Sequence, residues 1–108
     1  MTAQDTDCDV LIVGLGPVGA ALAVMLADRG LRVIAVEKDV EVYPLPRAAH
    51  FDHEIMRLFQ QMGLADEVSA HVRPAPAYEF RSARGELLMA FASPTSGTIS
   101  GWAQGYMF

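Results

Sequence analysis

The feature that most constrains this chain is the stretch VLIVGLGPVGAALAVMLA, which runs from residue 10 to residue 27 without a charged side chain. Length alone admits a membrane helix, since about twenty apolar residues span a bilayer. However, three glycines and Pro17 stand inside the run, and these are the poorest helix formers. The preceding flank carries Asp5, Asp7 and Asp9, whereas a signal peptide begins with positive charge. The sequence therefore favours a buried segment of a folded domain over a membrane span or a secretion signal.

The glycines divide this stretch into a strand, a turn and a helix. Residues 9–13, DVLIV, are typical of a strand buried on both faces of a parallel sheet. A helix is expected from about residue 17 to residue 29, with Gly30 just past its end. The segment RVIAVE, residues 32–37, supplies a second strand. This order predicts a Rossmann-like βαβ unit over residues 8–37.

The turn itself has the G-x-G-x-x-G spacing of dinucleotide-binding folds. Gly14 lets the chain turn sharply, Gly16 leaves its backbone open to a pyrophosphate, and Gly19 lets the helix lie close to the sheet. The helix N-terminus then presents amide N–H groups to a diphosphate. Glu37 ends the second strand, where it is expected to accept the hydroxyls of an adenosine ribose and to repel a 2′-phosphate. The pattern predicts an adenine dinucleotide site and leaves both FAD and NAD open.

The rest of the chain is expected to contain one more helix and a hairpin. The helix is placed near residues 51–62, before Gly63, with an apolar face made of Phe51, Ile55, Leu58, Phe59 and Met62. The segments AYEFRS and ELLMAF flank the turn ARG and predict a β-hairpin. Its inward side chains are expected to be Tyr78, Phe80, Leu87 and Met89. Trp102 and Tyr106 are expected to serve in ordinary packing.

These motifs follow one another in the order G-x-G-P-x-G, E-K, P-R-A and an amphipathic helix closing with MGL. In this order they resemble the class A flavoprotein aromatic hydroxylases, which share the para-hydroxybenzoate hydroxylase type of fold. Within that family, PRAAHFDHEIMRLFQQMGL is most similar to the 3-(3-hydroxyphenyl)propionate hydroxylases. The resemblance runs from about residue 8 to the end. It implies an α/β fold in which an incomplete, Rossmann-like βαβ FAD-binding domain carries a β-hairpin after its second helical segment.

On this interpretation, residues 1–108 are the N-terminal part of a single FAD-binding domain whose remainder is absent. Residues 8–37 form the βαβ fingerprint, residues 38–73 a loop and a helix, and residues 74–108 a hairpin and a loop. The chain also ends on the apolar residues YMF, which we interpret as a domain cut before its end.

The resemblance implies the cofactor and the residues that hold it. FAD would be bound, NADH or NADPH would reduce it, and O₂ and a phenolic ring such as 3-(3-hydroxyphenyl)propanoate would be the substrates, in the catabolism of an aromatic compound. Arg47 would reach the flavin side of FAD, and residues 48–50 would run near the isoalloxazine. The expected cofactor-binding residues are Gly14, Gly16, Pro17, Val18, Gly19, Glu37, Lys38, Arg47 and Ala48. No residue is assigned a catalytic role.

Two other functions stay open, a non-catalytic nucleotide-binding fragment and an NAD-dependent Rossmann oxidoreductase. In particular, the isolated chain is expected to bind FAD weakly and not to turn over. The segment HFDHE, residues 50–54, brings two histidines and two carboxylates together, but no further ligand-rich segment completes a metal site. No metal is therefore expected.

Charge and cysteine content restrict the partners and the cellular compartment that we expect for this chain. The net charge is −5, and no Lys/Arg cluster exists beyond the pair Arg81 and Arg84, which argues against nucleic acid. The single Cys8 cannot form an internal disulfide and fits a reducing cytoplasm, where it is expected to be a buried strand residue. Open sheet edges favour association between copies, as in a homo-oligomer. No membrane is expected as a partner.

Overall fold

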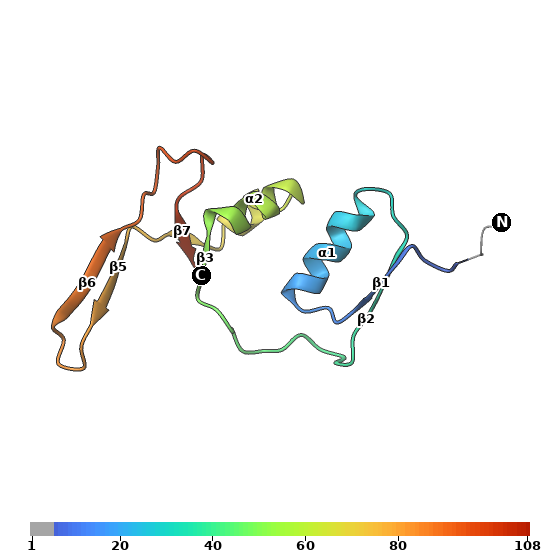
Figure 1. The fold of residues 1–108 in the computed structure, drawn as a ribbon, viewed down its shortest axis with the longest axis horizontal. Helices are drawn as coiled ribbons and strands as arrows, with labels where there is room; N and C mark the ends of the chain where they lie inside the picture. The colour runs from blue at the N-terminus through green and yellow to red at the C-terminus, as the bar shows by residue number, and fades with distance from the viewer. Residues whose placement is uncertain (1–5) are drawn as a thin grey trace. The chain divides into compact units, whose positions relative to one another are not determined.

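The computed structural model describes residues 6–108 and contains seven strands and three helices among them (Figure 1). Contacts between residues separate the chain into two units, which divide between Pro44 and Leu45. The first unit holds the glycine turn, and the second begins just before the P-R-A segment. Within the described part of the chain, no helix has the length and apolar character needed to cross a bilayer.

The first unit consists of a strand, a helix and a second strand. Strand β1 spans Val10–Val13, helix α1 spans Pro17–Ala27 and strand β2 spans Val33–Val36. The two strands are parallel, with Val10 opposite Val33, and α1 contacts both of them. The predicted βαβ unit is therefore confirmed (Figure 1).

The two faces of this small sheet differ in burial. Ile12 is buried and faces α1, because a Cβ on Gly19 would lie 3.5 Å from its Cγ2. The side chains that alternate with it, Leu11 and Val13, are exposed. The expectation of a strand buried on both faces is thus wrong for the described residues, since α1 covers one face only. Cys8 is half-buried and precedes β1, so its expected place inside a strand is also wrong.

The second unit is built around a three-stranded antiparallel sheet with β7 in its centre. Strand β3 spans His50–Asp52, β4 spans Arg73–Pro74 and β7 spans Gly105–Met107. Helix α2, His53–Gln61, follows β3 directly, and the short helix α3 spans Ala65–Ser69. Sequence reasoning did not predict α3, which has only five residues.

The second helix begins later than the apolar pattern predicts. Asp52 caps α2, because its Oδ1 accepts from the N–H groups of Glu54 (3.0 Å) and Ile55 (3.1 Å). Phe51 therefore lies on β3 instead of the helix, and its ring stacks on Tyr106 at a centroid distance of 5.4 Å. The face that α2 buries also differs from the expected one. Met56 is 0% exposed, whereas Ile55, which was expected in the core, is 39% exposed.

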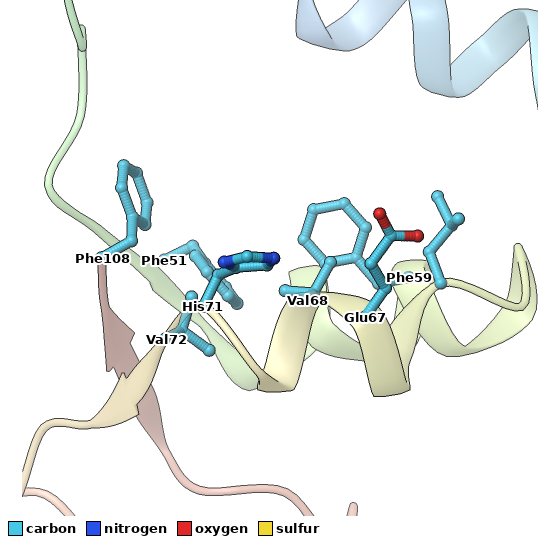
Figure 2. Close-up of a pocket in the computed structure, with 8 residues that line it drawn as sticks. Phe51, Phe59, Glu67, Val68, His71, Val72 and Phe108 are labelled. Atoms are coloured by element: carbon cyan, nitrogen blue, oxygen red, sulfur yellow. The ribbon is translucent and has the colours of Figure 1, made fainter.

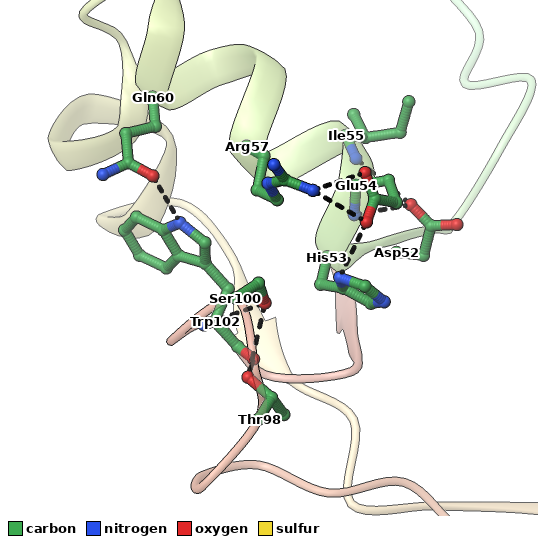
Figure 3. A network of polar contacts seen from close by, with 9 residues as sticks. All are labelled: Asp52, His53, Glu54, Ile55, Arg57, Gln60, Thr98, Ser100 and Trp102. Atoms are coloured by element: carbon green, nitrogen blue, oxygen red, sulfur yellow. Dashed lines mark hydrogen bonds and ion pairs between the residues drawn. The ribbon is translucent and has the colours of Figure 1, made fainter.

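The core of the second unit gathers around Met56 and Tyr106. Trp102 packs against this cluster, and its Nε1 donates to Gln60 Oε1 at 2.9 Å (Figure 3). The packing roles predicted for Trp102 and Tyr106 are confirmed. The other residues of the cluster are Phe51, Phe59, Ala65, Val68, Val72 and Ala103.

The predicted hairpin forms from β5, Ala77–Arg81, and β6, Leu87–Ala92, which pair antiparallel with a bulge at Phe80 and Arg81. Its expected burial is wrong for three of the four inward candidates. Phe80 is 52% exposed, and Leu87 and Met89 are equally open. Tyr78 is half-buried and stacks on Phe91 at a centroid distance of 5.2 Å. Within the second unit, Tyr78 places the hairpin against His50 and Gly105, and the far half of the hairpin projects beyond the core (Figure 1).

Candidate dinucleotide site

The turn between β1 and α1 needs glycine at two of the three glycine positions of the G-x-G-x-x-G motif, because of the conformation and packing of the turn itself. Gly14 has φ +103°, a left-handed conformation that side chains disfavour, and its N–H donates to Val36 O at 2.7 Å. Gly19 has no room for a side chain, because a Cβ would lie 2.0 Å from Gly14 O. Both glycines therefore shape the turn and seat α1 against it, as the sequence predicts.

Gly16 is different, because neither its backbone angles nor its neighbours among residues 6–108 require glycine there. Its φ of −64° and ψ of −179° suit any residue, and a Cβ would meet no atom within 4 Å. The absence of a side chain leaves its backbone open on the side where the helix begins. A bare, accessible backbone at this point fits the close approach of a diphosphate.

The N-terminus of α1 has the features of an anion site. Pro17 occupies the start of the helix, no side chain caps it, and its first turn holds no acidic residue. The first N–H groups of any helix lack acceptors within the helix. In α1 these N–H groups belong to Val18 and Gly19. Ala20 N–H already donates to Gly16 O at 2.9 Å. These donors, which have no acceptor within the helix, and the helix dipole favour a negative group at this end.

Glu37 ties the glycine turn to the end of β2. Its Oε2 accepts from Leu15 N–H at 2.7 Å, and its Oε1 accepts from the N–H groups of Lys38 (2.7 Å) and Asp39 (3.2 Å). These bonds, with Leu15 contributing most, hold the pKa of Glu37 below its ordinary value. A carboxylate has about four acceptor positions, so a position on Oε2 is left for a ribose hydroxyl.

This second task of Glu37 was not found by sequence reasoning. The partner, Leu15, contributes a backbone N–H, and no side-chain pattern marks such a donor. Lys38 likewise enters through its N–H, and its side chain is exposed. In the first unit the structure therefore brings together the seven predicted residues Gly14, Gly16, Pro17, Val18, Gly19, Glu37 and Lys38.

The remaining two predicted residues, Arg47 and Ala48, lie in the second unit on an exposed segment before β3. The end of that segment is fixed by β7. Phe108 N–H donates to Ala49 O at 3.3 Å, and His50 lies opposite Met107 in the β3–β7 ladder.

The carboxylates of residues 50–54 and His53 contact one another or residues at the start of α2, whereas His50 lies on β3 with its ring against Tyr78. Glu54 pairs with Arg57 at 3.1 Å, and His53 Nδ1 lies 3.5 Å from the same carboxylate (Figure 3). Asp52 is occupied as the cap of α2. Among residues 6–108, no group of three or more His, Cys, Asp or Glu side chains is arranged to hold a metal ion.

A cavity of about 410 Å³ lies on the second unit between β3, α2, α3 and the C-terminal residue. Figure 2 shows the aromatic rings of Phe51 and Phe59 on its wall, with Glu67 and His71 beside them. The cavity is apolar and contains none of the predicted cofactor-binding residues.

Comparison with known proteins agrees with these motifs. A family model described as FAD binding domain matches residues 7–100. The chain is 42% identical over 103 residues to a 3-(3-hydroxy-phenyl)propionate/3-hydroxycinnamic acid hydroxylase of Comamonas testosteroni, covering 94% of this chain and 17% of that protein. It is 38% identical over 99 residues to a probable NADH-specific resorcinol 4-hydroxylase of Rhodococcus jostii (strain RHA1), covering 92% of this chain and 18% of that protein.

The likeness extends to solved structures. The crystal structure of p-nitrophenol 4-monooxygenase PnpA from Pseudomonas putida DLL-E4 matches with a TM-score of 0.68 at 30% identity, covering 76% of this chain and 21% of that chain. The present chain spans about a sixth of the length of the curated relatives it matches. With the family model matching residues 7–100, the chain belongs to the FAD binding domain family, as the hydroxylase resemblance of its motifs predicts.

Proposed function

We propose that this chain forms the FAD-binding part of an NAD(P)H-dependent flavoprotein monooxygenase that hydroxylates a phenolic ring such as 3-(3-hydroxyphenyl)propanoate. The observation that carries the dinucleotide site is Gly16, whose bare backbone has no steric or conformational cause among residues 6–108, and the match of residues 7–100 to the FAD binding domain family supports FAD as the dinucleotide. The substrate class rests on the relatives, several of which are named as hydroxylases of 3-(3-hydroxyphenyl)propionate. One relative is named as NADH-specific, which supports NADH as the reductant.

In this proposal each part of the first unit has a defined task toward FAD. The N–H groups of Val18 and Gly19 at the start of α1 bind the diphosphate, which approaches over Gly16 with Gly14 and Pro17 beside it. Glu37 accepts a ribose hydroxyl on Oε2 while its other bonds keep the turn in shape. Lys38 adds a positive side chain next to that carboxylate.

Two residues of the second unit are proposed to act on the flavin side. Arg47 offsets diphosphate charge through its guanidinium, and Ala48 begins the stretch of backbone near the isoalloxazine. Bound FAD, once reduced by NADH or NADPH, supplies the chemistry that activates O₂ for insertion of one oxygen atom into the ring. The protein's share is to bind, to orient and to exclude water. We propose no acid or base among these residues.

The test is a flavin spectrum followed by a turnover assay on the protein that contains this chain. We expect a yellow protein with flavin absorbance that oxidises NADH and consumes O₂ when 3-(3-hydroxyphenyl)propanoate is added, with a ring-hydroxylated product identified by mass spectrometry. A colourless protein that binds NADH would support the NAD-dependent oxidoreductase instead. A yellow protein that oxidises NADH without hydroxylating any phenol would refute the proposed reaction but keep the cofactor.

A further inference from the structure

Two polar side-chain atoms converge on the backbone of Gly105 in the second unit. A Cβ on Gly105 would lie 2.4 Å from Tyr78 Oη and 3.3 Å from His50 Nε2. Gly105 is buried and is not one of the glycines with positive φ, so its backbone conformation does not require glycine. The missing side chain is instead what lets the phenol and the imidazole reach this point. Three strands, β3, β5 and β7, contribute one residue each.

The hydroxyl of Tyr78 is buried and has no hydrogen-bond partner among residues 6–108. Buried hydroxyls without a partner are rare and costly, so a specific cause is expected. The ring of Tyr78 is held on both sides. It stacks on Phe91, and it meets the ring of His50 edge-to-face with centroids 5.3 Å apart and planes at 78°. An acceptor for this hydroxyl is the Nε2 of that same imidazole, because both atoms lie against the position that a Cβ of Gly105 would occupy.

His50 stands at a position that matters for the proposed function. It is the last residue of the stretch 48–50, which is proposed to run beside the isoalloxazine, and this stretch follows Arg47. The backbone of this residue is fixed, because β3 pairs with β7 here and Phe108 N–H holds Ala49 O. What the backbone does not fix is the imidazole, whose two nitrogens differ in which one carries the proton.

We propose that Tyr78 is a positioning residue: its hydroxyl, seated on the bare backbone of Gly105, donates a hydrogen bond to His50 Nε2 and so keeps the imidazole proton on Nδ1. This bond supplies the partner that the buried hydroxyl lacks among residues 6–108. The exposed His50 then presents Nδ1–H as a fixed donor to an acceptor atom of a ligand beside residues 47–50. The identity of this ligand as the flavin rests on the proposed function, whereas the hydrogen bond between Tyr78 and His50 does not.

The test is ¹⁵N NMR of the histidine rings in the protein, which reports the proton position directly. A His50→Gln variant assigns the resonances, and the parent protein is compared with Tyr78→Phe, Gly105→Ala and Phe91→Leu. We expect His50 of the parent to carry its proton on Nδ1. Tyr78→Phe removes the donor, and Gly105→Ala adds a methyl that displaces the hydroxyl from the backbone of Gly105. Each variant should therefore shift the tautomer ratio toward Nε2–H by about five-fold, the effect of one net hydrogen bond.

Phe91→Leu is the matched control, because it loosens the packing of the Tyr78 ring but keeps the hydroxyl, and the tautomer ratio should stay within about two-fold of the parent. A parent protein with His50 mainly in the Nε2–H form overturns the proposal without any variant. Equal ratios in the parent, Tyr78→Phe and Gly105→Ala overturn it as well.

Titration of the same samples with FAD separates this inference from the proposed function. If FAD binds and His50 carries its proton on Nε2, the Tyr78 proposal is wrong and the cofactor assignment stands. If His50 carries its proton on Nδ1 and no FAD binds, the Tyr78 contact stands and the cofactor assignment is wrong.

Discussion

The two units of this chain are organised by different means. In the first, the architecture depends on where side chains are absent, since Gly14 and Gly19 shape the turn and Ile12 is the buried residue of its strand. In the second, it depends on side chains that fill a core, with Met56 fully buried and Tyr106 nearly so. The comparison teaches that the site is encoded by local backbone requirements, whereas the core is encoded by packing between distant segments.

The largest effect should come from the packed unit. Met56→Ala should lower the free energy of unfolding by about 2–5 kcal/mol, because it empties the centre of the cluster around Tyr106. Trp102, the single tryptophan of the chain, packs on that cluster and reports its unfolding by fluorescence in urea. The neighbouring Ile55→Ala is the control and should cost clearly less, since Ile55 is half out of the core. Equal losses would show that α2 buries the face expected from the sequence.

Next is the glycine that packing requires in the first unit. Gly19→Ala should destabilise that unit by about 3 kcal/mol, because its new Cβ meets the backbone carbonyl of Gly14, which cannot move aside cheaply. Amide hydrogen exchange across β1 and α1 measures this loss. Exchange in α2 should change less, and a uniform change along the whole chain would contradict the separation of the two units.

The same added methyl at the neighbouring glycine should act on the ligand instead. Gly16→Ala should leave the free energy of unfolding within about 0.5 kcal/mol, because open space surrounds the site. It should weaken FAD binding at least ten-fold, which is about 1.4 kcal/mol, because the methyl occupies the approach of the diphosphate. Fluorescence titration of FAD gives the dissociation constant. Unchanged affinity would remove the main support for the cofactor site.

The smallest effect depends on pH. The folded-state pKa of Glu37 is lowered, so the stability it contributes is present above its ordinary pKa, about 4.5, and is lost as the pH falls through the folded value. Glu37→Gln should therefore be less stable than the parent at pH 7, and the difference should be smaller at pH 3, because part of this stability is lost once the pH falls below the ordinary pKa. Urea unfolding at both pH values measures the difference. A gap that persists unchanged at pH 3 would mean that the charge of Glu37 does not matter to the turn.

Sequence reasoning worked best where structure is local. The order β1, glycine turn, α1 and β2 follows from spacing that a single segment carries, and the structure confirms it. The hairpin of β5 and β6 follows from its turn in the same way. The task of Glu37 toward the ribose stays a prediction, while its bond to Leu15 was missed because a backbone donor leaves no trace in residue types.

It failed where a distant partner decides. Phe51 has the spacing of a helical residue, but pairing of β3 with β7 and the cap at Asp52 place it on a strand. Met56 is buried and Ile55 exposed, because the cluster that contains Met56 is completed by Ala103 and Tyr106 from the distant end of the chain. The exposed far half of the hairpin has a related cause, because alternation predicts two faces but not which neighbour covers either one.

The three hydrogen bonds that Glu37 accepts from backbone N–H groups affect how fast a nucleotide binds. The N–H groups of Leu15, Lys38 and Asp39 hold the carboxylate and the loop in place as soon as the chain folds. Binding of the nucleotide therefore does not have to order them, and its entropic cost is lower. An adenosine group would bind to a site that is already ordered, and association would need no rearrangement of the loop.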